Sequence, residues 1–224
     1  MKIPMEIKDI VKIVDHTLLK QCSTSEDIEN LCREAVKYGA ASVCVPPSHV
    51  KIAAEFLKGA VPVCTVIGFP NGYSTTAVKC FETADAIANG AEEIDVVINL
   101  GFVREGRFDK VLEEIKAVKT ACGDKLLKVI IETCLLTEEE KIELCRVVSR
   151  SGAEFIKTST GFGGGGATRE DVALMRRESA DHVKVKASGG IASLEDAEDF
   201  INLGAERLGT SRVIKSVMEL ESKE

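Results

Sequence analysis

Four charged residues lie within short apolar runs of the kind that form buried β-strands. Asp95 interrupts E-I-D-V-V-I-N, Lys128 interrupts L-L-K-V-I-I-E-T, and Lys157 interrupts E-F-I-K-T-S-T. Lys186 ends the run H-V-K-V-K-A. A strand that is covered on both faces holds a charge where the charge is paired or has a chemical purpose. These residues are therefore structural ion pairs, strand-end side chains that reach solvent, or parts of one site.

Two lysines beside a carboxylate suit Schiff-base chemistry on a carbonyl substrate. A lysine amine near pKa 10.4 is a poor nucleophile at pH 7, and making much of it neutral requires its pKa to fall by ~3, about 4 kcal/mol. Burial supplies part of this fall. A second ammonium roughly 6 Å away, at an effective dielectric of ~20, supplies about 2.8 kcal/mol. Lys157, Lys186 and Asp95 could together form an imine, provided that their side chains face the same way.

Side-chain alternation does not decide which lysine of H-V-K-V-K-A faces inward, because Lys184 and Lys186 have the same parity. Lys186 lies nearer the C-terminal end of the predicted strand, where barrel active sites are built, and it directly precedes A-S-G-G-I. We therefore interpret Lys186 as the partner of Lys157.

Glycines lie at or just after the ends of the last three predicted strands. T-G-F-G-G-G-G-A-T begins where the strand at 154–160 ends, S-G-G-I follows the strand at 182–187, and L-G-T-S-R leads from the last strand into a helix. Glycines let a backbone approach a ligand and aim N–H groups at an anion, and a helix N-terminus also favours an anion. We expect these loops to hold a phosphate mainly through backbone N–H groups and helix N-termini, with little side-chain charge. The run at 163–166 also fits a flexible lid or a plain turn.

Eight short runs rich in β-branched and apolar residues recur along the chain, each followed by a segment with helical periodicity. They cover residues 13–17, 41–45, 62–67, 93–99, 126–133, 154–160, 182–187 and 206–210. Thr137, Thr168 and Ser193 mark helix starts, because each has an acid three residues later. Such units predict a parallel sheet, closed most simply into an α/β (β/α)8 TIM barrel of one domain over residues 1–224, with an open doubly wound sheet as the alternative.

Composition and residue counts argue against several kinds of binding partner. The chain is 45% hydrophobic and 29% charged, which is typical of a globular protein, and its net charge of -7 argues against nucleic acid. No secretory signal and no apolar run of ~20 residues occurs, so we expect a cytoplasmic protein that does not bind a membrane. The eight cysteines form no C-x-x-C pair and there are three histidines, so we expect neither a metal nor another cofactor.

The sequence closely resembles the deoxyribose-phosphate aldolase family along the whole chain. The most specific pair of motifs is I-K-T-S-T-G-F with V-K-A-S-G-G, joined by D-H-T-L-L, S-V-C-V-P-P, V-C-T-V-I-G-F-P, E-I-D-V-V-I-N-L-G and K-V-I-I-E-T. The resemblance implies a metal-free class I aldolase of deoxyribonucleoside catabolism. It would reversibly cleave 2-deoxy-D-ribose 5-phosphate to D-glyceraldehyde 3-phosphate and acetaldehyde, as a dimer or tetramer.

The resemblance also implies a role for each site residue. It places the Schiff base on Lys157, the pKa-lowering and proton-relay role on Lys186, and acid-base catalysis on Asp95. Around the substrate it places Asp15 and Thr160 near the hydroxyls, Cys44 and Lys128 in the pocket wall, and Gly161, Gly189, Gly190, Gly209 and Ser211 at the phosphate. Without the resemblance, Cys44 would be read as a small core residue and Asp15 as a capping or strand-end acid.

The chain departs from the family pattern at two places. Many members have Arg or Lys directly after G-G-I, where this chain has Ala192, so that a cationic phosphate contact is either missing or supplied by Arg212. The final E-S-K-E lacks the tail tyrosine of some members, so tail-assisted proton transfer does not carry over. Two other functions stay open: a Schiff-base aldolase or transaldolase with another sugar phosphate, and a non-catalytic barrel whose lysines neutralise a bound sugar phosphate.

Overall fold

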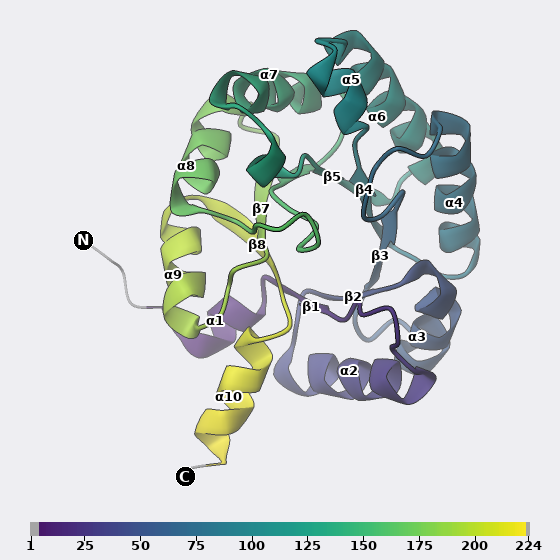
Figure 1. Ribbon diagram of the computed structural model, residues 1–224. Helices are drawn as coiled ribbons and strands as arrows, with labels where there is room; N and C mark the ends of the chain where they lie inside the picture. The colour runs from purple at the N-terminus through teal and green to yellow at the C-terminus, as the bar shows by residue number, and fades with distance from the viewer. Residues whose placement is uncertain (1–4, 223–224) are drawn as a thin grey trace.

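The computed structural model describes residues 5–222, and within them eight parallel strands form a closed barrel (Figure 1). Each strand pairs with the next one in the chain, and β8 pairs with β1. The strands are β1 (Val14–Thr17), β2 (Ser42–Val45), β3 (Val63–Ile67), β4 (Glu93–Val97), β5 (Leu126–Ile130), β6 (Phe155–Lys157), β7 (Lys184–Ser188) and β8 (Ala205–Thr210). The predicted TIM barrel is confirmed, and the open doubly wound sheet was the wrong alternative.

Helices surround the ring of strands (Figure 1). They are α1 (Ile7–Val11), α2 (Ser25–Tyr38), α3 (Val50–Leu57), α4 (Thr76–Ala88), α5 (Leu100–Arg104), α6 (Phe108–Cys122), α7 (Glu138–Ser149), α8 (Arg169–Glu178), α9 (Leu194–Asn202) and α10 (Val213–Glu221), with short 3-10 helices at Pro47–His49 and Thr133–Leu135. None of those in the described range has both the length and the apolar character needed to span a membrane. The tail residues Lys223 and Glu224 lie outside the described residues.

Side-chain hydrogen bonds fix the helix starts that the sequence predicts. Thr137 accepts from the Glu140 backbone N–H, and the Glu140 side chain accepts in return from the Thr137 N–H. Thr168 and Ser193 cap α8 and α9 in the same manner, each accepting from the backbone N–H three residues later. These caps satisfy N–H groups that a helix leaves without partners.

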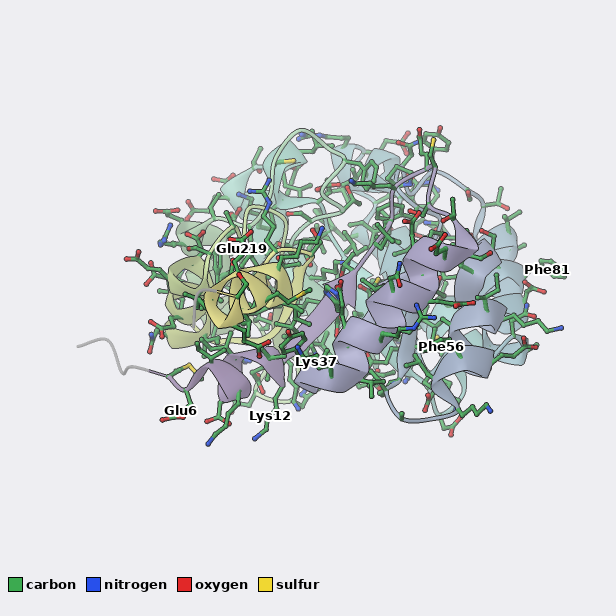
Figure 2. The ribbon with its side chains drawn as sticks, turned by 90° about the horizontal axis from the view of Figure 1, so that it is seen from below. Glu6, Lys12, Lys37, Phe56, Phe81 and Glu219 are labelled. Carbon is green, nitrogen blue, oxygen red and sulfur yellow. The ribbon has the colours of Figure 1, made fainter. Side chains whose placement is uncertain are left out.

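The last helix packs beside the end of α2 (Figure 2). Lys37 and Tyr38, at the end of α2, both donate to the Glu221 carboxylate, at 3.0 and 2.8 Å. This contact joins the end of the last described helix to the first complete β/α unit. The start of α10 lies at the C-terminal end of the barrel, because it follows the end of β8 closely.

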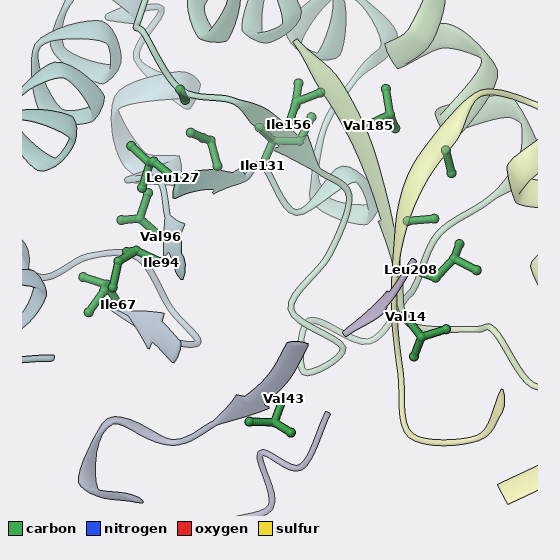
Figure 3. Packing of buried hydrophobic residues seen from close by; sticks show 14 of the residues in the cluster. Val14, Val43, Ile67, Ile94, Val96, Leu127, Ile131, Ile156, Val185 and Leu208 are labelled. Carbon is green, nitrogen blue, oxygen red and sulfur yellow. The ribbon is translucent and has the colours of Figure 1, made fainter. Parts of the chain in front are cut away.

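Apolar side chains on the outer face of the strands pack beneath the helices. Figure 3 shows them around the barrel, among them Val43, Ile94, Leu127, Ile156 and Val185, and all of these are buried. Burial of this apolar surface is the main force that closes the barrel. Because successive side chains of a strand alternate between its faces, the neighbouring residues in each strand face the barrel axis.

Three strands end earlier than the sequence predicted. β4 stops at Val97 rather than at residue 99, β5 at Ile130 rather than at residue 133, and β6 at Lys157 rather than at residue 160. Glu132 adopts a left-handed backbone with φ 54°, which a strand does not accommodate. Lys157 is therefore the last residue of its strand and stands at the mouth of the barrel.

Candidate active site

Charged side chains from most of the strands meet inside the barrel. The cluster consists of Asp15, Glu93, Asp95, Lys128, Lys157, Lys186 and Arg207. With every member ionised, four cations face three anions and leave one excess positive charge. Buried charges require partners, and each lysine of the cluster has at least one carboxylate partner.

Asp95 is the centre of the cluster. Its Oδ2 accepts from Lys157 Nζ and Lys186 Nζ, both at 2.7 Å, and its Oδ1 accepts from Lys128 Nζ at 2.8 Å and from Cys64 Sγ at 3.2 Å. Burial alone would raise the pKa of Asp95, but the charges of Lys128, Lys157 and Lys186 outweigh burial and hold that pKa well below its ordinary value. Asp95 is thus an ionised acceptor that contacts two of the predicted catalytic lysines at one oxygen.

Lys186 is held between two carboxylates. It donates to Asp95 and makes a short hydrogen bond to Asp15, whose other oxygen accepts from Ser42 at 2.7 Å and from Arg207 at 2.6 Å. Burial lowers the pKa of Lys186, but Asp15 and Asp95 raise it above its ordinary value. Lys186 therefore stays an ammonium beside Lys157 in the resting site.

Asp15 belongs to this buried charge cluster and does not cap a helix. Burial alone would raise the pKa of its carboxyl, but Lys186, Lys128 and Arg207 together hold it below the ordinary value. Lys128 is fully buried and lies 2.8 Å from Asp95 and 2.7 Å from Glu93. Both residues lie beneath the mouth of the barrel, so a substrate contact at either is still a prediction.

Lys157 is the lysine of this cluster that reaches a cavity. A cavity of about 400 Å³ opens at the C-terminal end of the barrel, and Lys157 lines it together with Thr160. The Lys157 side chain is 4% exposed, whereas those of Lys128 and Lys186 are fully buried. A carbonyl compound in the cavity would therefore meet Lys157 first.

The structure also separates the two lysines of β7. Lys184, at the start of the strand, has a side chain that is 53% exposed, with its Nζ 4.0 Å from Glu206. Lys186, two residues further along, is buried against Asp95. The interpretation of Lys186 as the inward partner of Lys157 agrees with this placement.

The five residues expected around the phosphate line the same cavity. They are Gly161, Gly189, Gly190, Gly209 and Ser211. Gly189 and Gly190 have φ values of 73° and 76°, which residues with a Cβ rarely adopt. A Cβ at Gly209 would overlap the Ser188 hydroxyl and lie 3.1 Å from Lys186 Cε, so close packing alone also requires glycine there.

Two helix N-termini near the cavity differ in their availability. At α9, the Asp196 side chain already accepts from the Ala192 N–H, and Ser193 caps the helix. At α10, the N-cap residue Arg212 makes no side-chain cap and the first turn has no acidic residue. The start of α10 can therefore attract an anion more readily than the start of α9.

Basic side chains also border the cavity, where the sequence argument expected little side-chain charge. Lys20, Arg212 and Lys215 all line it. The sequence suggested Arg212 as a replacement for the cation absent at Ala192, and the fold adds Lys20 from the loop after β1 and Lys215 from α10. The position of Lys20 could not be inferred without the barrel, because it is remote in sequence from the glycine segments.

Two cysteines lie side by side beneath the cavity. Cys44 and Cys64 are paired in register on β2 and β3 and pack with Val66. A hydrogen bond with Cys64 lowers the pKa of Cys44, whereas burial raises the pKa of Cys64 well above its ordinary value. The placement of Cys44 fits its reading as a small core residue, and a substrate contact at Cys44 is still a prediction.

Among residues 5–222, two groups of side chains have the spacing of metal ligands: Cys44, Cys64 and Asp95, and Asp15, Cys64 and Glu93. Lys128 Nζ already lies 3.3 Å from Cys64 Sγ and within 2.8 Å of the Asp95 and Glu93 carboxylates. A metal ion would have to displace this ammonium, so these groups fit a lysine better than a divalent cation.

Besides Lys20 and Lys215, the sequence argument missed Glu93, Ser188 and Arg207. Arg207 and Glu93 lie within predicted strands and pair with each other at 3.2 Å, so the search for charges inside strands should have included them. Ser188 lines the cavity, and its buried Oγ has no hydrogen-bond partner among the described residues. No sequence pattern singles out Ser188, because a serine beside two glycines is ordinary in a loop.

Comparison with known proteins places the chain in a family. The family model described as DeoC/LacD family aldolase matches residues 10–206. The chain belongs to this family. A deoxyribose-phosphate aldolase from Streptococcus pyogenes serotype M4 is 61% identical over 219 residues, which are 98% of this chain and 98% of that protein. The resemblance found in the motifs is thereby confirmed, and the protein is an aldolase.

Solved structures of aldolases have the same fold. One, described as QR15, an aldolase, is 40% identical with a TM-score of 0.91, covering 96% of this chain and 97% of that chain. A deoxyribose phosphate aldolase from Aeropyrum pernix, described as having a unique tetrameric structure, is 32% identical with a TM-score of 0.87, covering 98% and 94% of the two chains.

Proposed function

We propose that this aldolase reversibly cleaves 2-deoxy-D-ribose 5-phosphate to D-glyceraldehyde 3-phosphate and acetaldehyde through a Schiff base on Lys157. The observation that carries the proposal is the position of Lys157, which borders the cavity and shares Asp95 Oδ2 with Lys186. The names of relatives that are 60% and 61% identical support the choice of substrate. A catabolic role on deoxyribonucleoside-derived sugar phosphates follows from that substrate.

The first half of the reaction forms the imine. Lys157 first loses its proton to solvent and becomes a neutral amine. The neutral Nζ attacks C1 of the open-chain sugar, and the carbinolamine loses water to give a protonated imine. The ammonium of Lys186 stays beside the site and keeps Asp95 in place.

The second half breaks the carbon-carbon bond. Asp95 takes the proton of the C3 hydroxyl, the C2–C3 bond breaks, and its electron pair moves toward the imine to leave an enamine and glyceraldehyde 3-phosphate. The enamine then takes a proton at C2 from Asp95. Lys186, which is hydrogen-bonded to Asp95, acts as the proton-relay group beside it. Hydrolysis of the new imine by water releases acetaldehyde and returns the Lys157 amine.

The part of the cavity that is lined by glycines suits the phosphate. Gly189, Gly190 and Ser211 lie there with the uncapped start of α10, and Arg212 and Lys215 add positive charge. An anion at a helix N-terminus gains ~0.3–1 kcal/mol when exposed and up to ~2 kcal/mol when partly buried. Several such contacts acting together would hold the phosphate at the opposite end of the substrate from C1.

A product analysis tests this function against the rival sugar phosphates. The purified enzyme is incubated with 2-deoxy-D-ribose 5-phosphate and, separately, with sugar phosphates that yield a ketone or a longer aldehyde on cleavage. We expect acetaldehyde and glyceraldehyde 3-phosphate from the first substrate at a kcat/KM at least about a hundredfold above the others. Faster cleavage of another sugar phosphate would identify a different aldolase of the same family, and no cleavage of any would support a binding protein.

We further propose that the enzyme is a homo-oligomer, either a dimer or a tetramer, without a nucleic acid or membrane partner. The tetrameric relative supports an assembly, and the net charge of -7 argues against nucleic acid. Light scattering should give a multiple of the 24.1 kDa chain mass. A mass of one chain at micromolar concentration would reject this part of the proposal.

A cytoplasmic location is also proposed. All eight cysteines are free thiols, as expected in a compartment that keeps cysteines reduced. Activity that follows a cytoplasmic marker in cell fractionation would support the proposal, and activity outside that fraction would contradict it.

A further inference from the structure

Glu132 is a buried carboxylate beside the cavity, and the mechanism above gives it no role. It lies two residues after the end of β5, is 2% exposed, and has a left-handed backbone with φ 54° and ψ 66°. Among the described non-glycine residues, Lys58 is the other one with a positive φ, but Lys58 is exposed and caps the C-terminus of a helix. Such a conformation persists where the surrounding structure holds it and is enriched at functional sites.

The partner of Glu132 is Thr160, in the loop that follows Lys157. The Thr160 backbone N–H lies 3.2 and 3.3 Å from the two Glu132 oxygens, and the Thr160 hydroxyl donates a short hydrogen bond to Oε2. The same hydroxyl accepts from the Phe162 N–H at 3.0 Å. Both donors of Thr160 are thus committed to Glu132, and its hydroxyl can meet a substrate group as an acceptor.

No lysine or arginine of the described chain pairs with Glu132, which separates it from the ionic cluster below. Its remaining polar neighbour is the Cys134 thiol, with Sγ 3.9 Å from Oε1. Glu132 therefore acts here through its hydrogen-bond acceptor oxygens and not through an ion pair.

The glycine run packs between Glu132 and the phosphate end of the cavity, and we call residues 161–167 the glycine strap. A Cβ at Gly163 would lie 2.8 Å from Glu132 Cδ, and a Cβ at Gly166 would lie 2.6 Å from the Gly189 carbonyl carbon. The Ala167 N–H donates to the Ser188 and Gly189 carbonyls at 3.0 and 3.1 Å. Close packing on both sides argues against a freely mobile lid.

We infer that Glu132 is a positioning residue that fixes Thr160 and the glycine strap, and through the strap the approach of the substrate phosphate to Gly189 and Gly190. This inference rests on the proposed deoxyribose-phosphate aldolase function. Glu132 does not touch the reacting atoms. Without its oxygens, the donors of Thr160 lose their acceptors and the strap loses the side chain against which Gly163 packs.

The test compares Glu132→Ala and Glu132→Gln with the wild type. For Glu132→Ala we expect KM for 2-deoxy-D-ribose 5-phosphate to rise about tenfold or more, because small displacements of positioning groups have large effects. The KM for unphosphorylated deoxyribose should rise much less, and borohydride trapping of acetaldehyde on Lys157 should stay within about twofold. Glu132→Gln should recover most of the KM, because its amide oxygen can accept from the Thr160 N–H. Glu138→Ala, at the exposed start of α7, is the matched control and should behave as the wild type.

Gly163→Ala tests the same contact from the other side. Its φ is not in the left-handed region, so the main effect of the new methyl group is its overlap with the Glu132 carboxylate. We expect the same selective rise in KM. The double variant Gly163→Ala, Glu132→Ala should be no worse than Glu132→Ala alone, since the overlapping carboxylate is gone.

The outcomes separate this inference from the proposed function. If the wild type does not cleave 2-deoxy-D-ribose 5-phosphate, the proposed function fails. Suppose instead that the wild type cleaves it. The positioning role is then overturned if Glu132→Ala leaves KM unchanged, or if it lowers imine trapping and the activity on both substrates by the same factor. If Glu132→Ala does not fold, the Gln and Gly163→Ala variants decide, because selective KM changes support the role and equal losses on both substrates contradict it.

Discussion

The buried lysines of this aldolase differ in their surroundings rather than in their chemistry. Lys186 is enclosed by Asp15 and Asp95, which hold its pKa above the ordinary value, and Lys128 is enclosed by Glu93 and Asp95. Lys157 contacts one carboxylate and faces the cavity. Access to the cavity therefore favours Lys157 as the nucleophile, and the other two lysines are fixed cations that counter the carboxylates.

The role of Asp95 can be tested with Asp95→Asn, which preserves shape but cannot carry the proton. We expect kcat for cleavage to fall ~10²–10⁴-fold, the range for loss of a general acid-base group. Steady-state kinetics on 2-deoxy-D-ribose 5-phosphate provides the measurement, with circular dichroism as a check on folding. If kcat were unchanged and KM alone rose, Asp95 would be a binding residue.

Elements position these residues, and the sequence predicted the elements better than their ends. Each of the eight predicted strands overlaps an observed one, because β-branched runs and capped helices alternate along the chain. The ends of β5 and β6 were placed too late, since K-V-I-I-E-T and I-K-T-S-T continue the β-branched pattern past the last paired residue. Glu132 combines its left-handed backbone with a hydrogen bond from Thr160, 28 residues away, and local sequence patterns do not reveal such a contact.

The part of the candidate site that could be predicted from the residues is the part that places charged side chains inside strands, because such charges are unusual in buried strands. That criterion found Asp95, Lys128, Lys157 and Lys186, which the barrel brings into contact. It did not reveal which of them meets the cavity, because that depends on how far each side chain lies from the end of its own strand. The glycine strap could not be told from a lid, since packing against Glu132 and Gly189 exists only in the folded chain.

The phosphate end of the cavity can be tested at the element scale with Gly190→Val. Gly190 follows Gly189 in the turn after β7 and has a φ of 76°. A valine at this position would strain the backbone of the turn, and its side chain would obstruct the phosphate. We expect KM for 2-deoxy-D-ribose 5-phosphate to rise at least about tenfold, with a much smaller change for unphosphorylated deoxyribose.

A matched control for this substitution is Gly59→Val, at a positive φ of 83° in the turn between α3 and β3. It imposes similar backbone strain at the opposite end of the barrel and should leave both KM values unchanged. Equal losses on the two substrates in Gly190→Val would mean that the barrel or the lysines were damaged, and the phosphate assignment would then be withdrawn.

At the scale of the whole molecule, the barrel encloses a set of charges whose ionisation contributes to stability. The pKa values of Asp15 and Asp95 lie below their values in the unfolded chain, so their contribution is fully present above pH ~4 and is lost as pH falls through the folded values. Lys186 has a raised pKa, so its contribution is present below pH ~10 and is lost as pH rises further.

Urea unfolding across pH should therefore show a plateau in the free energy of unfolding between about pH 5 and pH 9, with a decline on both sides. We propose that residues 1–224 form one domain, so a single cooperative transition is expected. The Asp15→Asn variant should have a lower plateau and a shallower acid decline than the wild type. An acid decline as steep as that of the wild type would show that Asp15 does not carry the predicted linkage.

The central claim is that Lys157 forms the Schiff base, and the most direct test is to map the adduct. The enzyme is mixed with acetaldehyde, reduced with borohydride, digested and analysed by mass spectrometry, alongside Lys157→Met, in which an unbranched side chain of similar shape lacks the amine. We predict one added ethyl group on Lys157 in the wild type, and no adduct and no cleavage activity in the variant. An adduct on Lys186, or cleavage by Lys157→Met above a few per cent of the wild-type rate, would contradict the account.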